Sequence, residues 1–306
     1  MLSFLPGVLR GILAVIILVI NLLFWFIPLF PVAIVKLAVP LKPVRKSTDA
    51  ILNFICTTWA RGNGFFLMLL NDIEWDVQGD ANLSMNKWYL VLANHQSWAD
   101  IVVLQYILNN RIPYFRFFLK QQLVWLPIFN FVWAALDYPY MKRYSKTFLK
   151  KHPHLKGKDI ETTRKSCEKF RDTPVAIMNF VEGTRFTDEK HQRQKSNYRY
   201  LLNPKAGGIA FVLSAMGNQL NAILDVTIKY HPHAMGIWHF LCGRIHKVSV
   251  RIRSIPVAED LIGDYASDGQ FKIAFRKWIN QLWHEKDDLL VALHESSHQD
   301  EALPKN

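Results

Sequence analysis

Two side chains that could move a proton, His95 and Asp100, lie five residues apart in the segment "VLANHQSWAD". Five residues turn through about 500° along a helix, so the two side chains would face different sides of a single helix. A histidine oriented by a carboxylate is a common arrangement for a general base that works near neutral pH. The pair can therefore act together only if the chain turns between the two residues.

The local sequence predicts such a turn. The pattern S-x-x-D in "SWAD", ahead of the apolar run "IVVLQYIL", is typical of a helix start, with Ser97 as the N-cap and Asp100 as its N3 partner. His95 then lies in a loop between a strand and a helix, where Asp100 can reach back to the imidazole. Capping and orienting the histidine compete for the same carboxylate, so on this spacing alone a purely structural role for Asp100 stays open.

A second charged turn follows another apolar stretch, in "NFVEGTRFT" at residues 179–187. A glycine in such a turn lets the backbone bend tightly, and an arginine offers a bidentate guanidinium for a phosphate or a carboxylate. Open α/β sheets bind their ligands where strands end. We therefore expect this turn to line a binding site with four residues: Glu182, Gly183, Thr184 and Arg185.

At these residues the chain resembles the glycerolipid acyltransferase family typified by 1-acyl-sn-glycerol-3-phosphate acyltransferases (lysophosphatidate acyltransferases, PlsC-like). "NHQSWAD" matches the family's N-H-x-x-x-x-D, and "FVEGTR" matches its F-P-E-G-T-R. Within the family, "FLKQQLVW" and "MKRYS" look closest to the YihG-type branch of bacterial inner-membrane acyltransferases. The resemblance implies an α/β glycerolipid acyltransferase fold, with a mixed sheet flanked by helices and an N-terminal anchoring segment of two helices.

The resemblance also implies a reaction. A fatty acyl group would pass from acyl-coenzyme A or acyl carrier protein to the sn-2 hydroxyl of lysophosphatidic acid, giving phosphatidic acid, with no metal and no bound cofactor. His95 would be the general base and Asp100 its orienting partner. Arg143 would bind the acceptor together with the residues of the second turn, Glu182 to Arg185, and Arg185 would contact the phosphate.

Some positions depart from the family pattern. Val181 stands where the family has proline, Asp137 and Tyr140 replace the glycine and phenylalanine of its second motif, and "LDVTIKY" lacks the prolines of its fourth. These changes affect the identity of the acceptor substrate more than the type of reaction. Another lysophospholipid, such as lysophosphatidylglycerol, is an alternative acceptor, and a non-catalytic lipid-binding protein on the same fold is an alternative of another class.

The N-terminal part is apolar enough to meet a membrane. The 25 uncharged residues between Arg10 and Lys36 exceed, as a helix, the roughly 30 Å hydrocarbon core of a bilayer. More basic residues follow this segment than precede it, which places the rest of the chain in the cytoplasm. A second apolar segment, residues 50–70, is interrupted by "ARGNG". That favours an interfacial or re-entrant helix, with a core helix of the globular domain as the alternative.

Three regions are expected on these grounds. Residues 1–70 form a membrane anchor with helices at 11–35 and 50–70, residues 71–290 form the catalytic domain, and residues 291–306 form a polar, poorly ordered tail. Strands are expected at 73–77, 88–93, 175–181, 224–230 and 247–257, and helices at 98–108, 159–171, 205–216 and 271–282. Strands that alternate with helices indicate an α/β domain around a mixed sheet.

Composition narrows the class of partner. Half of the residues are hydrophobic, the mean hydropathy is +0.05, and 37 basic residues outnumber 25 acidic ones. This combination favours anionic membrane lipids over nucleic acid. The resemblance implies the inner membrane of a bacterium, with the catalytic domain on its cytoplasmic face. Residues 140–171 hold eleven basic and three acidic residues, either as a solvated face or against head groups. The three distant cysteines suit a reduced compartment.

Two other chemistries are weaker. "HESSH", from His294 to His298, matches the H-E-x-x-H pattern of zinc proteases, but it lies in a polar segment near the end of the chain with no clear third ligand. An acyl-serine intermediate on Ser97 is a further alternative. The chain lacks the G-x-S-x-G pattern of serine hydrolases, and a capping role already explains Ser97.

Overall fold

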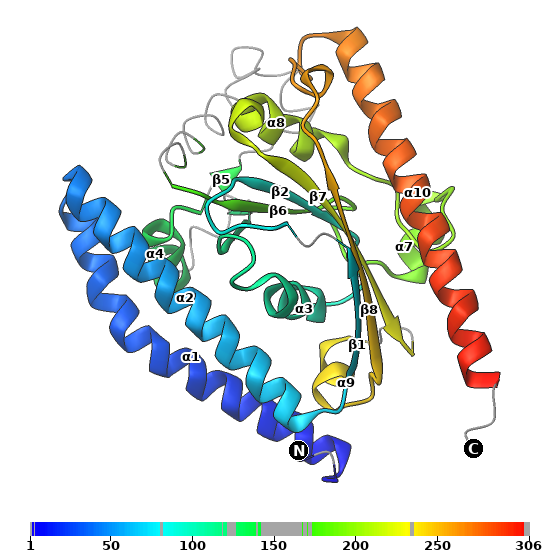
Figure 1. The fold of residues 1–306 in the computed structure, drawn as a ribbon, viewed down its shortest axis with the longest axis horizontal. Helices are drawn as coiled ribbons and strands as arrows, with labels where there is room; N and C mark the ends of the chain where they lie inside the picture. Colours follow the sequence, from blue (N-terminus) through cyan, green and yellow to red (C-terminus); the bar gives the residue numbers. More distant parts are fainter. Residues whose placement is uncertain are drawn as a thin grey trace.

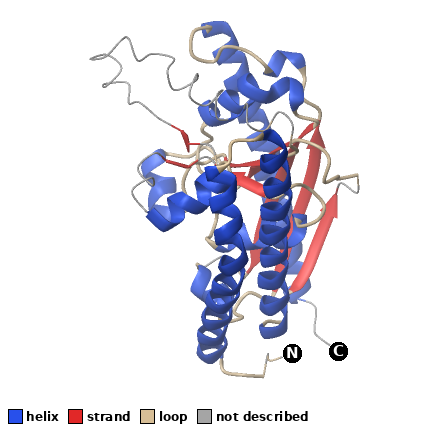
Figure 2. Ribbon diagram, turned by 90° about the vertical axis from the view of Figure 1, so that its left-hand side faces the viewer, coloured by secondary structure: helices blue, strands red, loops and turns tan. Residues whose placement is uncertain are grey.

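The computed structural model describes residues 2, 4–79, 82–117, 119–120, 127–138, 140–141, 167, 170, 173–232 and 236–302. A central sheet lies between two layers of helices, and a long helical hairpin runs along one side of the molecule (Figure 1). Figure 2 views the same arrangement from the hairpin side, with the strands behind the long helices.

The main sheet has six strands in the order β1-β8-β7-β2-β6-β3. Neighbouring strands are parallel except β7 and β8, which are antiparallel, so the sheet is mixed as predicted. The strands are β1 (Glu74–Gly79), β2 (Tyr89–Ala93), β3 (Phe115–Phe117), β6 (Ala176–Phe180), β7 (Ala222–His231) and β8 (Lys247–Ile255). Two short parallel strands, β4 (Leu119–Lys120) and β5 (Tyr140–Met141), form a separate ribbon.

Helices cover both faces of this sheet, and the central strand β2 is buried along its whole length. Its residues alternate between two cores, with Val91 packed towards α3 (Ala99–Leu108) and α9 (Ile237–Leu241), and Leu92 towards α8 (Ala206–Met216) and α10 (Gly269–Ala302). A strand covered on both faces reads as a continuous apolar run, which is why "YLVLA" carries no polar residue. The remaining short helices are α4 (Pro127–Ala135), α7 (Asp188–Gln194), η3 (Gly217–Gln219) and η4 (Glu259–Leu261).

The hairpin consists of α1 (Gly7–Ala38) and α2 (Lys42–Leu70), which pack against each other. The helix expected at residues 50–70 lies within α2, which continues through the "ARGNG" residues 60–64. The polar and small residues of this stretch serve close packing. The Asn21 amide of α1 donates to Asn63 Oδ1 at 2.8 Å, and Gly64 lies against the Tyr106 ring of α3. Helix α2 therefore also fills part of the role of a core helix.

A buried cluster of charges joins the hairpin to the rest of the domain. The Lys36 ammonium at the end of α1 donates to Ala135 O and pairs with Asp137 and Asp49, and Arg45 of α2 also pairs with Asp137 at 3.1 Å. Asp137 has a positive φ of 55°, a conformation that glycine adopts without strain and Asp tolerates better than most residues. This explains how Asp can stand where the resembled family has glycine.

The five predicted strands are confirmed, with ends shifted by a few residues. The polar tail, expected to be poorly ordered after Leu293, is helical there instead, because α10 continues to Ala302. Leu290 and Leu293 are buried, and the His294 ring stacks on Tyr200 at 3.9 Å, which gives this part of the helix a packed face. The helix predicted at 159–171 falls almost entirely outside the described residues.

Candidate active site

The two charged turns lie side by side at one edge of the sheet. Strands β2 and β6 are parallel neighbours, and Ala93 pairs with Phe180, so the residues that follow both strands emerge together. Two hydrogen bonds join the turns directly. The backbone N–H of Phe186 donates to His95 O at 2.7 Å, and the backbone N–H of His95 donates to the Glu182 carboxylate at 2.8 Å. The site thus forms where parallel strands end, as the sequence predicts.

His95 and Asp100 meet across the turn after β2. His95 Nδ1 lies 2.8 Å from Asp100 Oδ2, and the carboxylate has no exposed surface whereas the histidine side chain is 12% exposed. An ionised carboxylate can only accept hydrogen bonds, so this geometry assigns the imidazole proton to Nδ1 and leaves a lone pair on Nε2. The arrangement therefore provides a proton acceptor at the carboxyl edge of the sheet.

Asp100 fills both of the roles that the sequence left in competition. Besides the histidine, Oδ2 accepts from the backbone N–H groups of Gln96 at 2.7 Å and Ser97 at 2.9 Å. The helix start differs in detail from the prediction, since α3 begins at Ala99 and the N-cap position belongs to Trp98, which makes no side-chain capping bond. Ser97 Oγ instead accepts from the Ala99 N–H at 3.2 Å.

Three further residues support this pair. Asn94 and Phe180 begin the two matched motifs, whereas Tyr230 carries no recognisable signal in the sequence. The Tyr230 hydroxyl of β7 donates to Asp100 Oδ1 at 2.7 Å, and burial beside that carboxylate holds the pKa of Tyr230 well above its usual value, so it remains a donor. The Phe180 ring stacks on the imidazole at 3.9 Å. The Asn94 amide bridges to both backbone groups of Ile228 at 2.9 Å.

Glu182 occupies the equivalent place after β6, but its environment differs. It has no exposed surface, and its carboxylate accepts from the backbone N–H of His95 and from that of Leu202 at 2.9 Å. Burial raises the pKa of Glu182 to about 8, against the effect of these two hydrogen bonds. In this structure the carboxylate holds two loops together and has no surface to offer a ligand.

The rest of this turn faces outward. Gly183 has a φ of 66°, a conformation that glycine adopts without strain and other residues rarely adopt. The Lys190 ammonium donates to Thr184 Oγ1 at 3.0 Å and to Arg185 O at 2.8 Å. The Arg185 guanidinium lies 4.7 Å from the centre of the Trp98 ring. Arg143, also predicted to bind the acceptor, lies outside the described residues.

Helix α10 supports the site from behind the second turn. Asp287 accepts from the backbone N–H groups of Arg199 at 2.6 Å and Tyr200 at 2.8 Å, and the Trp283 indole donates to Leu202 O at 3.1 Å. Leu202 in turn donates to Glu182. The amphipathic pattern of α10 predicts a packed helix, but no local signal shows which loop the helix holds.

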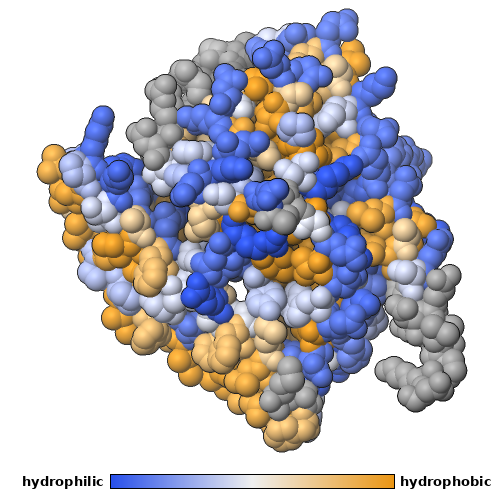
Figure 3. All heavy atoms as spheres, in the orientation of Figure 1, coloured by the Kyte–Doolittle hydropathy of each residue, from blue (hydrophilic) through white to orange (hydrophobic). Residues whose placement is uncertain are grey.

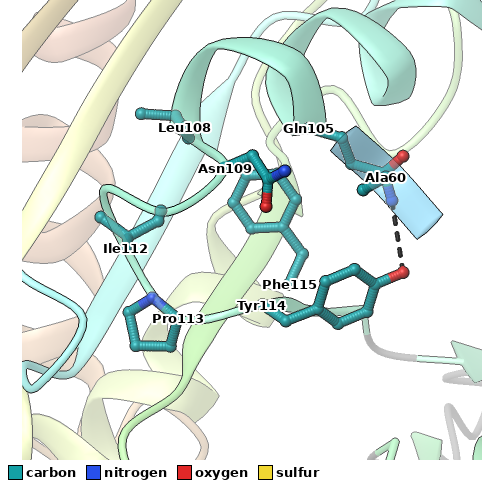
Figure 4. Close-up of a pocket in the computed structure, with 8 residues that line it drawn as sticks. All are labelled: Ala60, Gln105, Leu108, Asn109, Ile112, Pro113, Tyr114 and Phe115. Atoms are coloured by element: carbon teal, nitrogen blue, oxygen red, sulfur yellow. Dashed lines mark hydrogen bonds between the residues drawn. The ribbon is translucent and has the colours of Figure 1, made fainter. Parts of the chain in front are cut away.

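The other candidate sites gain no support. The two histidines of "HESSH" lie within the single helix α10, and the described residues contain no cluster of three or more potential metal ligands. A small pocket lies where Ala60 of α2 meets the segment from α3 to β3, and Figure 4 shows the Gln105 amide bonded to the Tyr114 hydroxyl there, at 3.4 Å. None of the described site residues lines this pocket, so it is separate from the histidine.

Comparison with known proteins identifies the family of the chain. A family model described as Acyltransferase matches residues 74–235, more than half of the chain. The chain belongs to the acyltransferase family. Both charged turns fall within the matched range, whereas the hairpin and α10 lie outside it.

Characterised members of the acyltransferase family are similar over part of their length. The chain is 25% identical over 255 residues to "1-acyl-sn-glycerol-3-phosphate acyltransferase epsilon" of Mus musculus. This match covers 76% of this chain and 65% of the relative. It is also 25% identical over 184 residues to "1-acyl-sn-glycerol-3-phosphate acyltransferase gamma" of Mus musculus. This match covers 56% of this chain and 43% of the relative. The chain therefore spans less than two thirds of these curated relatives.

Among solved structures, the 1-acyl-sn-glycerophosphate acyltransferase PlsC of Thermotoga maritima is similar with a TM-score of 0.47 and 16% identity, covering 89% of this chain and 97% of that one. The resemblance to the YihG-type branch stays a prediction.

Proposed function

We propose that this protein transfers a fatty acyl group from an acyl thioester to the sn-2 hydroxyl of lysophosphatidic acid, giving phosphatidic acid. One observation carries the proposal. His95 is oriented through Nδ1 by a fully buried carboxylate, which leaves Nε2 as a base beside a turn that presents Arg185. The names of the relatives, 1-acyl-sn-glycerol-3-phosphate acyltransferases, support this choice of acceptor.

The reaction asks for one proton acceptor and no protein nucleophile. His95 Nε2 takes the proton of the acceptor hydroxyl while that oxygen attacks the thioester carbonyl carbon. The carbon–sulfur bond then breaks. The thiolate leaves readily because its conjugate thiol has a pKa of only about 8.5. The imidazolium gives its proton to the departing thiolate, which returns His95 to its neutral form. Asp100 stabilises that imidazolium, and Tyr230 holds the second oxygen of Asp100 in place. No step needs a metal ion or a bound cofactor.

Arg185 is the residue that we assign to the acceptor phosphate, because a guanidinium binds phosphate through two parallel hydrogen bonds. Thr184 lies beside it in the same turn. For Glu182 we propose a positioning role in place of the acceptor contact expected from the sequence, since its carboxylate is buried and engaged by two backbone groups. Arg143 keeps its expected role as a second acceptor contact.

The hairpin is the part of the molecule that we assign to the membrane. Helix α1 is long and apolar enough to cross a bilayer, and most of its large side chains are exposed, with Ile27 at 71% and Phe24 at 61%. In Figure 3 these apolar side chains form the lower left edge, over the position of α1 and α2 in Figure 1. An exposed apolar surface of this length suits lipid far better than water.

The contacts of α1 favour a helix that lies along the membrane surface. Near its start, Gly11 lies against Cys242 and Trp238 of the segment around α9, and at its end Lys36 bonds to Ala135 and Asp137. Both ends of the helix thus touch the same domain, which a perpendicular crossing would not allow. Exposed Lys42 and Lys46 follow the turn and suit anionic head groups on the cytoplasmic face of a bacterial inner membrane.

The test is an acylation assay in mixed micelles. Wild type and His95→Ala receive labelled acyl-coenzyme A or acyl carrier protein as donor and a panel of lysophospholipids as acceptors, with lysophosphatidylglycerol included. We expect phosphatidate from wild type only, and a rate lower by at least about 10²-fold for the variant, as for the loss of a general base.

Each other result has a defined meaning. Equal product from wild type and the variant would remove His95 from the mechanism. Product on a different lysophospholipid alone would keep the chemistry and replace the acceptor. If no pair of substrates gives product, and both wild type and His95→Ala still bind lipid, the protein is a non-catalytic lipid-binding protein.

A further inference from the structure

Trp98 lies in the turn between the two catalytic candidates but has no part in their hydrogen bonds. Its side chain is 51% exposed, which is unusual for a tryptophan that packs within a domain. The Arg185 guanidinium of the neighbouring turn lies 4.7 Å from the centre of its ring. This distance is well within the roughly 6 Å over which a cation is attracted to an aromatic face.

Both turns that carry this contact are held rigidly. Asp100 accepts from the backbone N–H groups of Gln96 and Ser97, immediately before Trp98. On the other side, the N–H of Phe186, immediately after Arg185, donates to His95 O, and Lys190 donates to Arg185 O. The backbones of both partners are therefore fixed with respect to the imidazole, and the guanidinium is the part that needs an additional support.

A guanidinium can contact an aromatic ring and a phosphate at the same time. Where its face lies on the π-system, its N–H edges stay available for hydrogen bonds to a phosphate, which form in the guanidinium plane. Within the described part of the chain, the guanidinium forms no ion pair. An arginine held in this way loses less freedom when it binds a ligand, which favours affinity.

We propose that Trp98 is a positioning residue for Arg185, whose ring holds the guanidinium with its N–H edge towards the phosphate of a lysophospholipid acceptor. This inference rests on the proposed function and deepens it. It assigns Trp98 an effect on acceptor affinity and none on proton transfer, because Trp98 does not contact His95 Nδ1 or either oxygen of Asp100 through its side chain.

The experiment compares four proteins, namely wild type, Trp98→Ala, Trp98→Leu and Trp98→Phe. The acceptor is a short-chain lysophosphatidate used below its critical micelle concentration, so that membrane binding does not enter the measured KM. We expect KM to rise about twofold to fivefold in the alanine and leucine variants, the range of an exposed cation–π contact, with kcat unchanged from wild type. The phenylalanine variant keeps a ring and should stay within about twofold.

A second measurement asks whether Trp98 acts through Arg185. The change Trp98→Leu is repeated in an Arg185→Ala background, where the positioned group is missing. We expect the rise in KM caused by the leucine to disappear there, since coupled residues give non-additive effects. The leucine and phenylalanine variants also carry the test alone if the alanine variant fails to fold.

The outcomes separate this inference from the proposed function. If wild type makes no phosphatidate that depends on His95, the proposed function fails. If wild type is active but the leucine variant keeps its KM, or raises KM equally with and without Arg185, the positioning role of Trp98 is overturned. An unchanged KM together with weaker binding to vesicles of phosphatidylglycerol and phosphatidylethanolamine would overturn it in favour of a membrane contact.

Discussion

Two buried carboxylates at the same edge of the sheet differ in what they hold. Asp100 follows β2 and Glu182 follows β6, and neither side chain has exposed surface. Asp100 accepts four hydrogen bonds, from two backbone N–H groups, the His95 imidazole and the Tyr230 hydroxyl. Glu182 accepts two, both from backbone N–H groups. One carboxylate orients a ring that can exchange a proton, and the other fixes the position of the loop that carries the ring.

The difference shows that burial alone does not identify a catalytic carboxylate. A buried charge needs hydrogen-bond donors to replace water, and both residues have such donors. What separates the two is the kind of donor. An imidazole, which can accept and release a proton, bonds to Asp100, whereas only backbone N–H groups bond to Glu182. Substitutions at the two positions should accordingly damage different properties of the enzyme.

The largest effect is expected from Asp100→Asn. Asparagine carries no charge, so it cannot stabilise the imidazolium that forms when Nε2 takes the proton of the acceptor hydroxyl. We expect kcat to fall by about 10³-fold to 10⁴-fold, the size of the loss that this change causes in serine protease triads. Steady-state acylation assays on wild type and variant measure it. Asp76→Asn, on β1 in a pair with Arg251, is the matched control and should keep activity within about twofold. Equal losses in both variants would contradict the prediction.

Glu182→Gln should act mainly on stability. The amide keeps one acceptor oxygen but turns an NH₂ towards one of the two backbone N–H groups, which leaves a buried donor unsatisfied. Such a loss costs about 1–3 kcal/mol. We expect the free energy of unfolding in urea, measured in micelles at pH 5, to fall by that amount, and kcat to fall less than in Asp100→Asn. A stable variant with an inactive site would instead assign Glu182 a direct part in the reaction.

The raised pKa of Glu182 adds a pH dependence to this comparison. Because burial raises its pKa from 4.5 to about 8, the folded protein binds a proton there that the unfolded chain lacks between these two values. The contribution of Glu182 to stability is therefore complete below pH 4.5 and is lost as the pH rises through about 8. Glu182→Gln cannot titrate, so the free-energy difference between wild type and variant should be larger at pH 5 than at pH 8.5. A free-energy difference between wild type and variant that grows with pH would contradict a raised pKa for Glu182.

The sequence predicts the parts of this site that are local. Apolar runs such as "YLVLA" and "VAIMNFV" identify buried strands, because parallel strands covered on both faces carry few polar residues. The turns after these strands contain His95, Asp100 and Gly183 in spacings that only a strand-to-helix turn or a positive φ explains. Chemistry encoded within one turn can thus be read from one segment of chain.

The parts that the sequence does not predict all join distant segments. Tyr230 reaches Asp100 from a strand 130 residues later, and Asp287 of α10 holds the backbone of Arg199 across 88 residues. A buried tyrosine or aspartate on an amphipathic pattern has no spacing to its partner that a single sequence could reveal. The sequence does not show the partners of Asn63 and Gly64 for the same reason, because these residues contact α1 and α3.

The smallest effect is expected from Tyr230→Phe, which removes one of four donors to Asp100 and leaves the imidazole contact intact. We expect kcat to fall by about twofold to tenfold, the size of one net hydrogen bond. Steady-state acylation assays on wild type and variant measure this change. Tyr198→Phe, which lies outside the pair, is the control and should keep kcat within about twofold of wild type. An unchanged kcat in Tyr230→Phe would show that the hydroxyl contributes nothing to the orientation of Asp100.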